Sequence, residues 1–454
     1  MKDMYQFMRF VSYRSLQNWS VQYTRSEGFG YNDKYPMIRI GSFLRRSRTV
    51  TEIADAEDYK QVTVRTNNGG VCLRGTKKGK DIGTKRQTRV HQGQYIISKI
   101  DARNGAFGII PKELDGAIVT NDFPVFDVDN TVIMTDFLLL VTTTKQFLNF
   151  AQSCSSGTTN RRRIDIDKFL EQKIPMPDIE EQKRLLNIYY KNLQRIEDAK
   201  SKIDRLKEKI DSYILEKLSV DVKSSTLEPI SGCRFLKKAH SSSIKRWDCY
   251  HIKEEPQSNL YENKVLADII SSDPMYGAAF KTSDSFNGIR YIRITDIKED
   301  GNLNDTSVSA QEYDERYLLK DNDFLIARSG NTVGKTFLYK NIYGKAIFAG
   351  YLIKFTLNEQ LLNPKYLLYY TKSSIYKQWI ESNKRVSAQP NINSQQYLGS
   401  PIILPPIKIQ NILVSYIQQQ YENIQKQEEA IKHYSVLALS EFETALFSSH
   451  EYVL

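Results

Sequence analysis

The sequence contains few residues that could form covalent or metal cross-links. Its four cysteines include no CxxC pair, and its five histidines include no HxxxH pair. Structural zinc sites and the disulfide frameworks of secreted proteins depend on such residues at short, regular spacings. We therefore expect neither a disulfide framework nor a metal site in this chain. Cysteine usage of this kind fits the reducing cytoplasm.

Long hydrophobic runs are also absent. No stretch of about 18 apolar residues occurs, and the first residues, MKDMYQFMRFVSYRS, lack the apolar segment of a signal peptide. We therefore predict a soluble, cytoplasmic protein with no membrane partner.

The chain carries an excess of positive charge. Lys and Arg number 64 against 53 Asp and Glu, which gives a net charge of +11. An excess of positive charge favours a polyanionic partner such as nucleic acid.

Three partial catalytic motifs occur, and each lacks an essential feature. SGNTVGKT (329–336) has Ser329 where a phosphate-binding loop requires glycine, so we predict a strand–turn–strand there. DPMY (273–276) is similar to the loop that holds a flipped base in amino-methyltransferases, but Met275 replaces the required proline, and we predict a turn. The nuclease-like set around Asp178 lies at a predicted helix start, where an acid is favoured by the helix dipole. We therefore predict a chain that is not itself catalytic and binds no cofactor of its own.

Residues 179–218 have the pattern of a single long helix. They include no proline or glycine over about 40 residues, which corresponds to a helix about 60 Å long. Apolar residues recur at two positions of a seven-residue repeat, as in a coiled coil. These residues are Tyr189, Ile196, Ile203 and Ile210, followed three positions later by Ala199, Leu206 and Tyr213. A helix with such an apolar seam must pack against a partner helix.

The chain itself contains that partner. Residues 408–447 carry a similar seam 228 residues later. Its apolar residues are Ile417, Ile424, Ile431 and Ala438. The two helices are each preceded by a short proline-containing joint, which favours an antiparallel pair because the second helix can then begin near the end of the first.

The same offset continues outside the helices. Trp19 and Trp247 are 228 residues apart, and the joint KIPMPDIEEQ matches PIILPPIKIQ so that Gln182 aligns with Gln410. The strand-like segment QYIISKIDARNG aligns with DFLIARSGNTVG at an offset of 229. A constant offset through helices, strands and turns is typical of an internal repeat.

We therefore predict an α+β protein in which two similar globular domains are separated by two long antiparallel coiled-coil helices, with an internal pseudo-two-fold repeat. The predicted segments are an N-terminal segment (1–18), a first domain (19–179), a central spacer helix (180–221), a second domain (222–406) and a distal spacer helix (407–454). In the first domain we expect strands at 37–43, 59–66, 95–100 and 117–128, and a helix at 135–152.

Basic residues are the candidates for a binding site. Lys and Arg can contact DNA phosphates, and Arg can also read base edges. We interpret the basic, glycine-rich stretch 73–103 and an arginine cluster on a later loop as DNA-binding loops of the first domain. The first-domain candidates are Arg74, Lys77, Lys78, Lys80, Lys85, Arg86, Arg89, Lys99, Arg103, Arg161, Arg162 and Arg163. The second-domain candidates are Arg290, Arg293, Arg328, Lys335, Lys384 and Arg385.

Taken together, these features resemble the specificity (S) subunit of type I DNA restriction–modification systems. The resemblance covers nearly the whole chain. It is carried by Trp19 and Trp247 at the domain entries, by the segments GQYIISKIDARNGAFGI and NDFLIARSGNTVGK, and by the joints PMPDIEEQK and LPPIKIQN with their long helices. The sequence around Gln410 and the polar seam residues Gln427 and Glu441 depart from the first copy, which affects the detail of helix packing.

The resemblance implies two target-recognition domains, each of which binds one half of a bipartite, asymmetric site in double-stranded DNA. It further implies two modification subunits, which bring S-adenosylmethionine and methylate adenine N6, and two restriction subunits, which bring ATP and Mg. The chain would give these enzymes their sequence specificity. Two alternatives stay open: an amino-methyltransferase that acts alone through DPMY, and an adaptor that binds only proteins.

Overall fold

The computed structural model describes residues 31–153, 155–156, 163–220, 257–283, 285–286, 288–298, 300–384 and 390–447. The predicted N-terminal segment and both Trp19 and Trp247 lie outside these residues. The chain divides into two compact units. Unit 1 takes in Met1–Asp198 and Ala430–Leu454, and unit 2 takes in Ala199–Glu429. None of the described helices is both long and apolar enough to cross a membrane.

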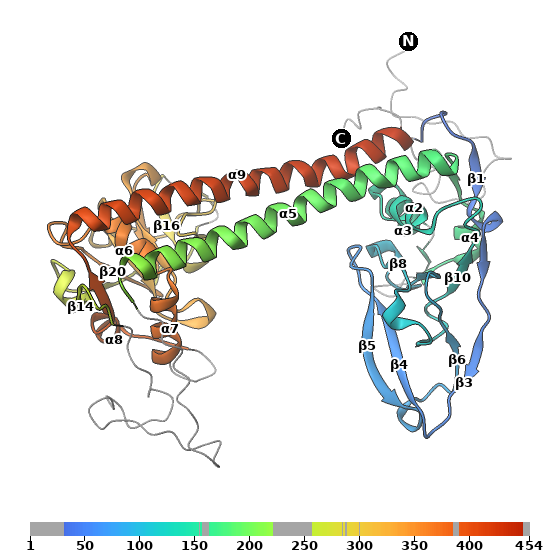
Figure 1. Ribbon diagram of the computed structural model, residues 1–454, viewed down its shortest axis with the longest axis horizontal. Coiled ribbons are helices and arrows are strands. Elements are labelled where there is room, and N and C mark those ends of the chain that lie inside the picture. Colours follow the sequence, from blue (N-terminus) through green and yellow to red (C-terminus); the bar gives the residue numbers. More distant parts are fainter. Residues whose placement is uncertain are drawn as a thin grey trace, which may run out of the picture. The chain divides into compact units, whose positions relative to one another are not determined.

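The centre of unit 1 is a four-stranded antiparallel sheet (Figure 1). Its strands lie in the order β2 (Leu44–Arg46), β10 (Val125–Val128), β7 (Tyr95–Ile97) and β8 (Phe107–Ile109). All three residues of β7 are buried. Its unbroken apolar run is typical of a central strand that is covered on both faces.

Unit 2 repeats this sheet strand for strand. The order is β15 (Met275–Tyr276), β20 (Leu352–Phe355), β17 (Phe324–Ala327) and β18 (Thr336–Leu338), again antiparallel throughout. Phe324 lies opposite Phe355 as Tyr95 lies opposite Phe126, and each of these positions recurs after 229 residues. The internal repeat predicted from the sequence is confirmed by the identical strand order and by the shared register of β20, β17 and β18 with β10, β7 and β8.

The four-stranded sheet of unit 2 tests two of the motif predictions. SGNTVGKT forms a strand–turn–strand from β17 through a 3-10 turn at Gly330–Thr332 to β18, as predicted. The turn predicted for DPMY is wrong, because Met275 and Tyr276 form the edge strand β15. Their partners are Lys354 and Ile353 on β20, far along the chain.

Short helices follow the sheet in each unit. Unit 1 has α2 (Thr135–Thr142), α3 (Lys145–Ser153) and α4 (Ile166–Glu171), and unit 2 has α6 (Pro364–Tyr370), α7 (Ser374–Asn383) and α8 (Ser394–Leu398). The single helix expected at 135–152 is therefore wrong. The hydroxyls of Thr142, Thr143 and Thr144 each donate to the carbonyl three residues earlier. Such back-bonding competes with the helical ladder, and here it accompanies the break between α2 and α3.

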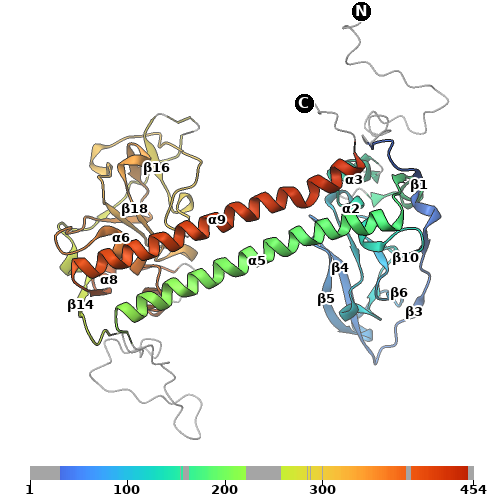
Figure 2. The ribbon, with the colours of Figure 1, turned by 45° about the horizontal axis from the view of Figure 1, so that its top comes forward.

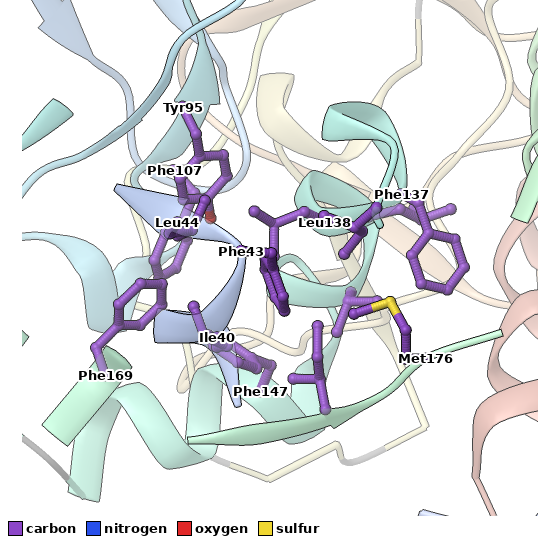
Figure 3. Packing of buried hydrophobic residues seen from close by; sticks show 14 of the residues in the cluster. Ile40, Phe43, Leu44, Tyr95, Phe107, Phe137, Leu138, Phe147, Phe169 and Met176 are labelled. Atoms are coloured by element: carbon purple, nitrogen blue, oxygen red, sulfur yellow. The ribbon is translucent and has the colours of Figure 1, made fainter. Parts of the chain in front are cut away.

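The core of unit 1 joins the sheet, the short helices and parts of both long helices. Figure 3 shows Phe107 and Phe147 among its buried side chains; their ring centroids are 6.0 Å apart in an edge-on arrangement. Phe137 of α2 meets Phe442 near the end of the chain in the same way, at 5.5 Å. Leu185 and Leu186 also belong to this core. Domain and helices are thus packed into one hydrophobic cluster.

The two units differ outside the shared sheet. Unit 1 adds a five-stranded sheet, in the order β3 (Val50–Glu52), β6 (Arg86–Arg89), β9 (Ile118–Val119), β4 (Asp58–Val64) and β5 (Val71–Lys78). In the described part of unit 2 the corresponding sheet has two parallel strands, β16 (Arg290–Ile292) and β19 (Ala346–Phe348). The interpretation of 73–103 as loops is therefore wrong outside the predicted strand at 95–100, because the stretch also contains β6 and most of β5. The strand expected at 117–128 is likewise two strands, β9 and β10.

Small sheets complete both units. β1 (Met37–Arg39) pairs with β13 (Lys173–Pro175) in unit 1, and β14 (Glu262–Val265) pairs with β21 (Pro401–Leu404) in unit 2. β11 (Ser155–Ser156) pairs with β12 (Arg163–Ile164). β1 ends at Arg39, where a 3-10 turn begins, so it is shorter than the strand expected at 37–43.

The two long helices are confirmed as α5 (Ile179–Lys217) and α9 (Ile407–Leu446). In unit 1 the Arg195 guanidinium of α5 lies 5.1 Å from the centre of the Tyr434 ring in the later part of α9. In unit 2 Tyr213, near the end of α5, stacks on Tyr416, near the start of α9, with ring centroids 3.8 Å apart. Within each unit the helices therefore run antiparallel, as Figure 2 shows.

The predicted seams are mostly buried. Ile203 and Ile210 of α5 and Ile417 and Ile424 of α9 are each less than a tenth exposed. The α9 seam shifts near its end, because Phe442 is buried while the adjacent Glu441 is exposed. A step of four residues in place of three keeps the seam on the same face of an α-helix.

A buried glutamine fastens each long helix to its own domain. The side chain of Gln182 accepts a hydrogen bond from the backbone N–H of Met134 (2.8 Å) and donates to the carbonyls of Val132 (3.1 Å) and Pro177 (2.9 Å). Gln410 repeats this pattern with Asn363 (2.7 Å), Leu361 (3.0 Å) and Pro405 (2.8 Å). Both glutamines are fully buried. Each satisfies three backbone groups that would otherwise be unpaired in the core.

Candidate nucleic-acid interface

The predicted cations of the first domain gather on the five-stranded sheet of unit 1. Arg74, Lys77 and Lys78 are exposed on β5, which is the edge strand of this sheet, and Lys80 is exposed in the turn that follows. The sheet presents these charges on regular structure rather than on loops. Lysines on an edge strand also discourage pairing with another chain, which is a reason for their charge that is independent of binding.

The other cations of this sheet differ in how far they are already engaged. Lys85 donates to Asp55 (2.6 Å) and to the carbonyl of Gly79 (2.7 Å). Arg89 is half-buried and donates to the carbonyl of Gly116 (3.3 Å). Arg86 is exposed on β6, where Glu52 lies opposite it. Arg74, Lys77, Lys78 and Lys80 are therefore better placed to meet a phosphate backbone than Lys85 or Arg89.

Lys99 and Arg328 occupy equivalent positions in the two units. Lys99 lies just beyond β7, where its N–H donates to the carbonyl of Asp122 (2.8 Å) and its carbonyl accepts from Ile164 (2.9 Å). Arg328 lies just beyond β17, where its N–H donates to Tyr351 (3.0 Å) and its carbonyl accepts from Ile392 (2.9 Å). The fold therefore presents one cation at the same place in both repeats, with different neighbours.

The arginine cluster of the first domain is only partly described. Arg161 and Arg162 lie outside the described residues, whereas Arg163 is exposed in β12 and pairs with Asp122 at 3.1 Å. In unit 2, Arg385 lies outside the described residues, and Lys384 pairs with Glu381 at 2.6 Å.

Four further candidates are embedded in their own domains. Arg290 is nine-tenths buried and donates to the carbonyls of Asn304 (2.6 Å) and Thr306 (3.2 Å). Arg293 pairs with Asp296 at 2.7 Å. Arg103 and Lys335 are each half-buried beside a 3-10 turn or within it. Arg290 and Arg293 are bonded to groups of their own domain, and a DNA role for either would need its present partners to be released.

Tyr276 joins Arg328 in a cluster that sequence reasoning did not predict. The Arg328 guanidinium lies 4.9 Å from the centre of the Tyr276 ring, and the Tyr276 hydroxyl donates to Oγ of Ser394 at 3.0 Å. Burial alone would raise the pKa of Tyr276, but the hydrogen bonds from Ser394 and the charge of Arg328 outweigh it and lower that pKa below its ordinary value.

The sequence contained one signal for this cluster. DPMY drew attention to Tyr276, but only as part of a methyltransferase loop. The 228–229 offset would have aligned Arg328 with Lys99, and Tyr351 with Asp122, had it been applied residue by residue. Among the described residues, no group of three or more His, Cys, Asp or Glu side chains is placed to hold a metal ion.

Comparison with known proteins agrees with this geometry. The family model for the type I restriction modification DNA specificity domain matches residues 32–208 and 260–433. The EcoEI specificity subunit of Escherichia coli is 20% identical over 413 residues, covering 74% of this chain and 68% of that protein. The StySPI specificity subunit of Salmonella potsdam is 22% identical over 306 residues, covering 65% of this chain and 61% of that protein.

One solved structure has the same fold, with a TM-score above 0.5. A chain from work on complex assembly and conformational transition in a type I R-M system has a TM-score of 0.55 at 15% identity, covering 91% of this chain and 98% of that chain. The HsdS subunit of Thermoanaerobacter tengcongensis has a TM-score of 0.44 at 15% identity, covering 92% and 98%. With the family domain matched twice, once in each repeat, the chain belongs to the type I restriction–modification DNA specificity family, as a non-catalytic specificity subunit.

Proposed function

We propose that this chain binds a bipartite, asymmetric site in double-stranded DNA, and that each unit reads one half of it. The observation that carries the proposal is the repeated sheet with different residues at equivalent places. Lys99 beside Asp122 and Arg328 beside Tyr351 occupy the same position of the fold but offer different chemistry. Different side chains in the same setting predict different half-sites.

Two recognition units on one chain also suit the energetics. A mismatched base pair costs about 1–3 kcal/mol, so a single small unit that reads few base pairs discriminates weakly. Joining two units makes the second binding event intramolecular and adds their discrimination. The long helices fix the order and spacing of the units in this proposal. Their length, more than their surface chemistry, determines the gap between half-sites.

The proposed complex contains two modification subunits and two restriction subunits, assembled on this chain in the cytoplasm. S-adenosylmethionine would bind the modification subunits, which methylate adenine N6, and ATP and Mg would bind the restriction subunits. A target adenine must leave the duplex to be methylated, and base flipping is then a task of the modification subunit.

The test combines duplex binding with methyl transfer. The purified chain, alone and with its modification subunit, is incubated with labelled S-adenosylmethionine and genomic DNA. We expect salt-dependent DNA binding and methyl transfer only when the modification subunit is added. Methyl transfer by the chain alone would favour the solitary methyltransferase, and absence of DNA binding by both samples would favour the protein-only adaptor.

A further inference from the structure

The pair formed by Arg328 and Tyr276 lies where β17 ends beside the edge strand β15. The Tyr276 hydroxyl is fixed by two hydrogen bonds, one donated to Oγ of Ser394 (3.0 Å) and one accepted from the Ser394 backbone N–H (3.1 Å). The guanidinium lies over the ring at 4.9 Å. A guanidinium attracted to a fixed aromatic ring is restricted in its movement, so it loses little conformational entropy when it binds a ligand.

Arg328 differs from the other described arginines of residues 257–384 and 390–404. Arg290 donates to two carbonyls, Arg293 pairs with Asp296, and Arg316 pairs with Asp314 at 2.7 Å. Within that part of the chain, no carboxylate is paired with the Arg328 side chain. The guanidinium of Arg328 is therefore oriented by Tyr276 without a carboxylate partner in that part of the chain, as expected of a group that binds a ligand.

Two buried polar atoms lie in the adjacent segments that contain Arg328 and Asn391. Nε of Arg328 and Oδ1 of Asn391 are both buried and have no hydrogen-bond partner among the described residues. Ser329 and Asn391 form a β-bridge, which keeps these segments adjacent. Because Nε is covered, the terminal nitrogens are the donors that remain for an incoming group. Tyr276 is 37% exposed, so solvent reaches the pair.

Resting on the proposed function, we propose that Arg328, held over the ring of Tyr276, reads a guanine in the half-site bound by unit 2. Guanine presents the acceptors O6 and N7 side by side in the major groove, and the paired nitrogens of a guanidinium match them. A phosphate offers similar acceptors but carries no base identity. The equivalent Lys99 of unit 1 lacks the planar pair of donors of a guanidinium, so the inference concerns the half-site bound by unit 2.

The assembled complex of this chain with its modification subunit provides the test. Methylation mapping first identifies the site of the wild-type complex. Binding is then measured on duplexes that carry each of the four base pairs at every position of the site. The variants are Arg328→Lys, Arg328→Gln and Tyr276→Leu. Arg316→Gln is the matched control, because Arg316 also lies over a tyrosine, Tyr317, but is already paired with Asp314.

We expect the wild-type complex to prefer guanine at one position by about tenfold or more, and Arg328→Gln to reduce that preference to less than about threefold. Arg328→Lys keeps the charge but not the planar pair of donors, so it should retain binding with a reduced preference, and it serves if Arg328→Gln binds too weakly to measure. Tyr276→Leu should lower the preference partly, and Arg316→Gln should leave it unchanged.

Uniform weakening on all duplexes with an unchanged base preference would identify Arg328 as a phosphate contact and overturn the inference. The inference would also fail if all base preferences survived in both Arg328 variants. These results differ from a failure of the proposed function, in which the wild-type complex itself would yield no bipartite site.

Discussion

Unit 1 and unit 2 build the same four-stranded sheet from segments 229 residues apart, but they surround it differently. In unit 1 a five-stranded sheet presents exposed cations on its edge strand β5. In the described part of unit 2 only the pair β16–β19 corresponds to it, and Arg290 and Arg293 of that region are bonded to groups of their own domain. The two units thus share a sheet and differ in the segments around it, where the proposed readout of different half-sites would arise.

The largest expected effect tests whether the two scaffolds are equivalent. Gln182→Leu and Gln410→Leu each remove three buried hydrogen bonds between a long helix and its domain. We expect each to destabilise its own unit by about 3 kcal/mol, because backbone groups are left buried and unpaired. Hydrogen exchange should show weaker protection around 132–134 for the first variant and around 361–363 for the second.

Gln194→Leu and Gln425→Leu are the controls, since both glutamines are exposed on the same helices. Their effects should stay within about 0.5 kcal/mol. If only one of Gln182→Leu and Gln410→Leu destabilises its unit, the two joints do not contribute equally to stability.

The second effect tests the difference between the readers. Replacing Arg74, Lys77 and Lys78 by Gln should weaken duplex binding by about tenfold or more at moderate salt. The salt slope should fall by about one for each phosphate that is no longer neutralised. Base preference should stay the same, because phosphate contacts carry no sequence information. Fluorescence anisotropy over a series of salt concentrations measures both the affinity and the salt slope.

Lys207→Gln with Lys209→Gln removes exposed charge from α5 and is the matched control. An equal reduction of affinity in this control would mean that only net charge matters. The β5 surface would then have no special part in binding.

A smaller effect concerns a buried threonine hydroxyl that is hydrogen-bonded to different residue types in the two units. Tyr95 donates to Thr142 at 2.7 Å, whereas Thr336 and Thr371 lie 2.8 Å apart at the equivalent place, near Phe324 on β17. Tyr95→Phe and Thr336→Val should each cost about 1 kcal/mol of unfolding free energy. Urea denaturation measures this, and negligible cost in both variants would show that neither hydrogen bond contributes.

The smallest effect is a pH dependence confined to unit 1. Glu181 accepts hydrogen bonds from Tyr35 (2.8 Å) and Arg184 (2.6 Å), whereas the equivalent residue of unit 2 is Ile409. The hydrogen bond from Arg184, above all, lowers the pKa of Glu181 to about 2. A lowered folded-state pKa adds stability above the unfolded pKa near 4.5, and that stability is lost as pH falls toward 2.

Glu181→Gln should therefore cost up to about 1 kcal/mol at neutral pH, with the difference from wild type shrinking between pH 4.5 and 2. Glu180→Gln, at a largely exposed neighbour, should show little effect at any pH. A Glu181→Gln difference that does not change with pH would assign the stabilisation to packing rather than charge.

The sequence predicts the features that recur in both repeats. It does not predict features that depend on a contact with a residue far away along the chain. The 228-residue offset aligns Gln182 with Gln410, and their identical hydrogen bonds follow from that alignment. The local sequence around Tyr276 predicts a turn, whereas the structure has a strand there. That strand forms by pairing with β20, where Tyr276 lies opposite Ile353, far along the chain. Phe442 replaces Glu441 in the seam because its neighbour there is Phe137, from a different element. Local periodicity cannot supply such partners.

The most direct test of two different readers on one scaffold is the methylation map of cells that express this chain with its modification subunit. We predict one site with two specified halves of different sequence, separated by an unspecified gap of constant length. A single continuous site, or two identical halves in inverted order, would contradict the account.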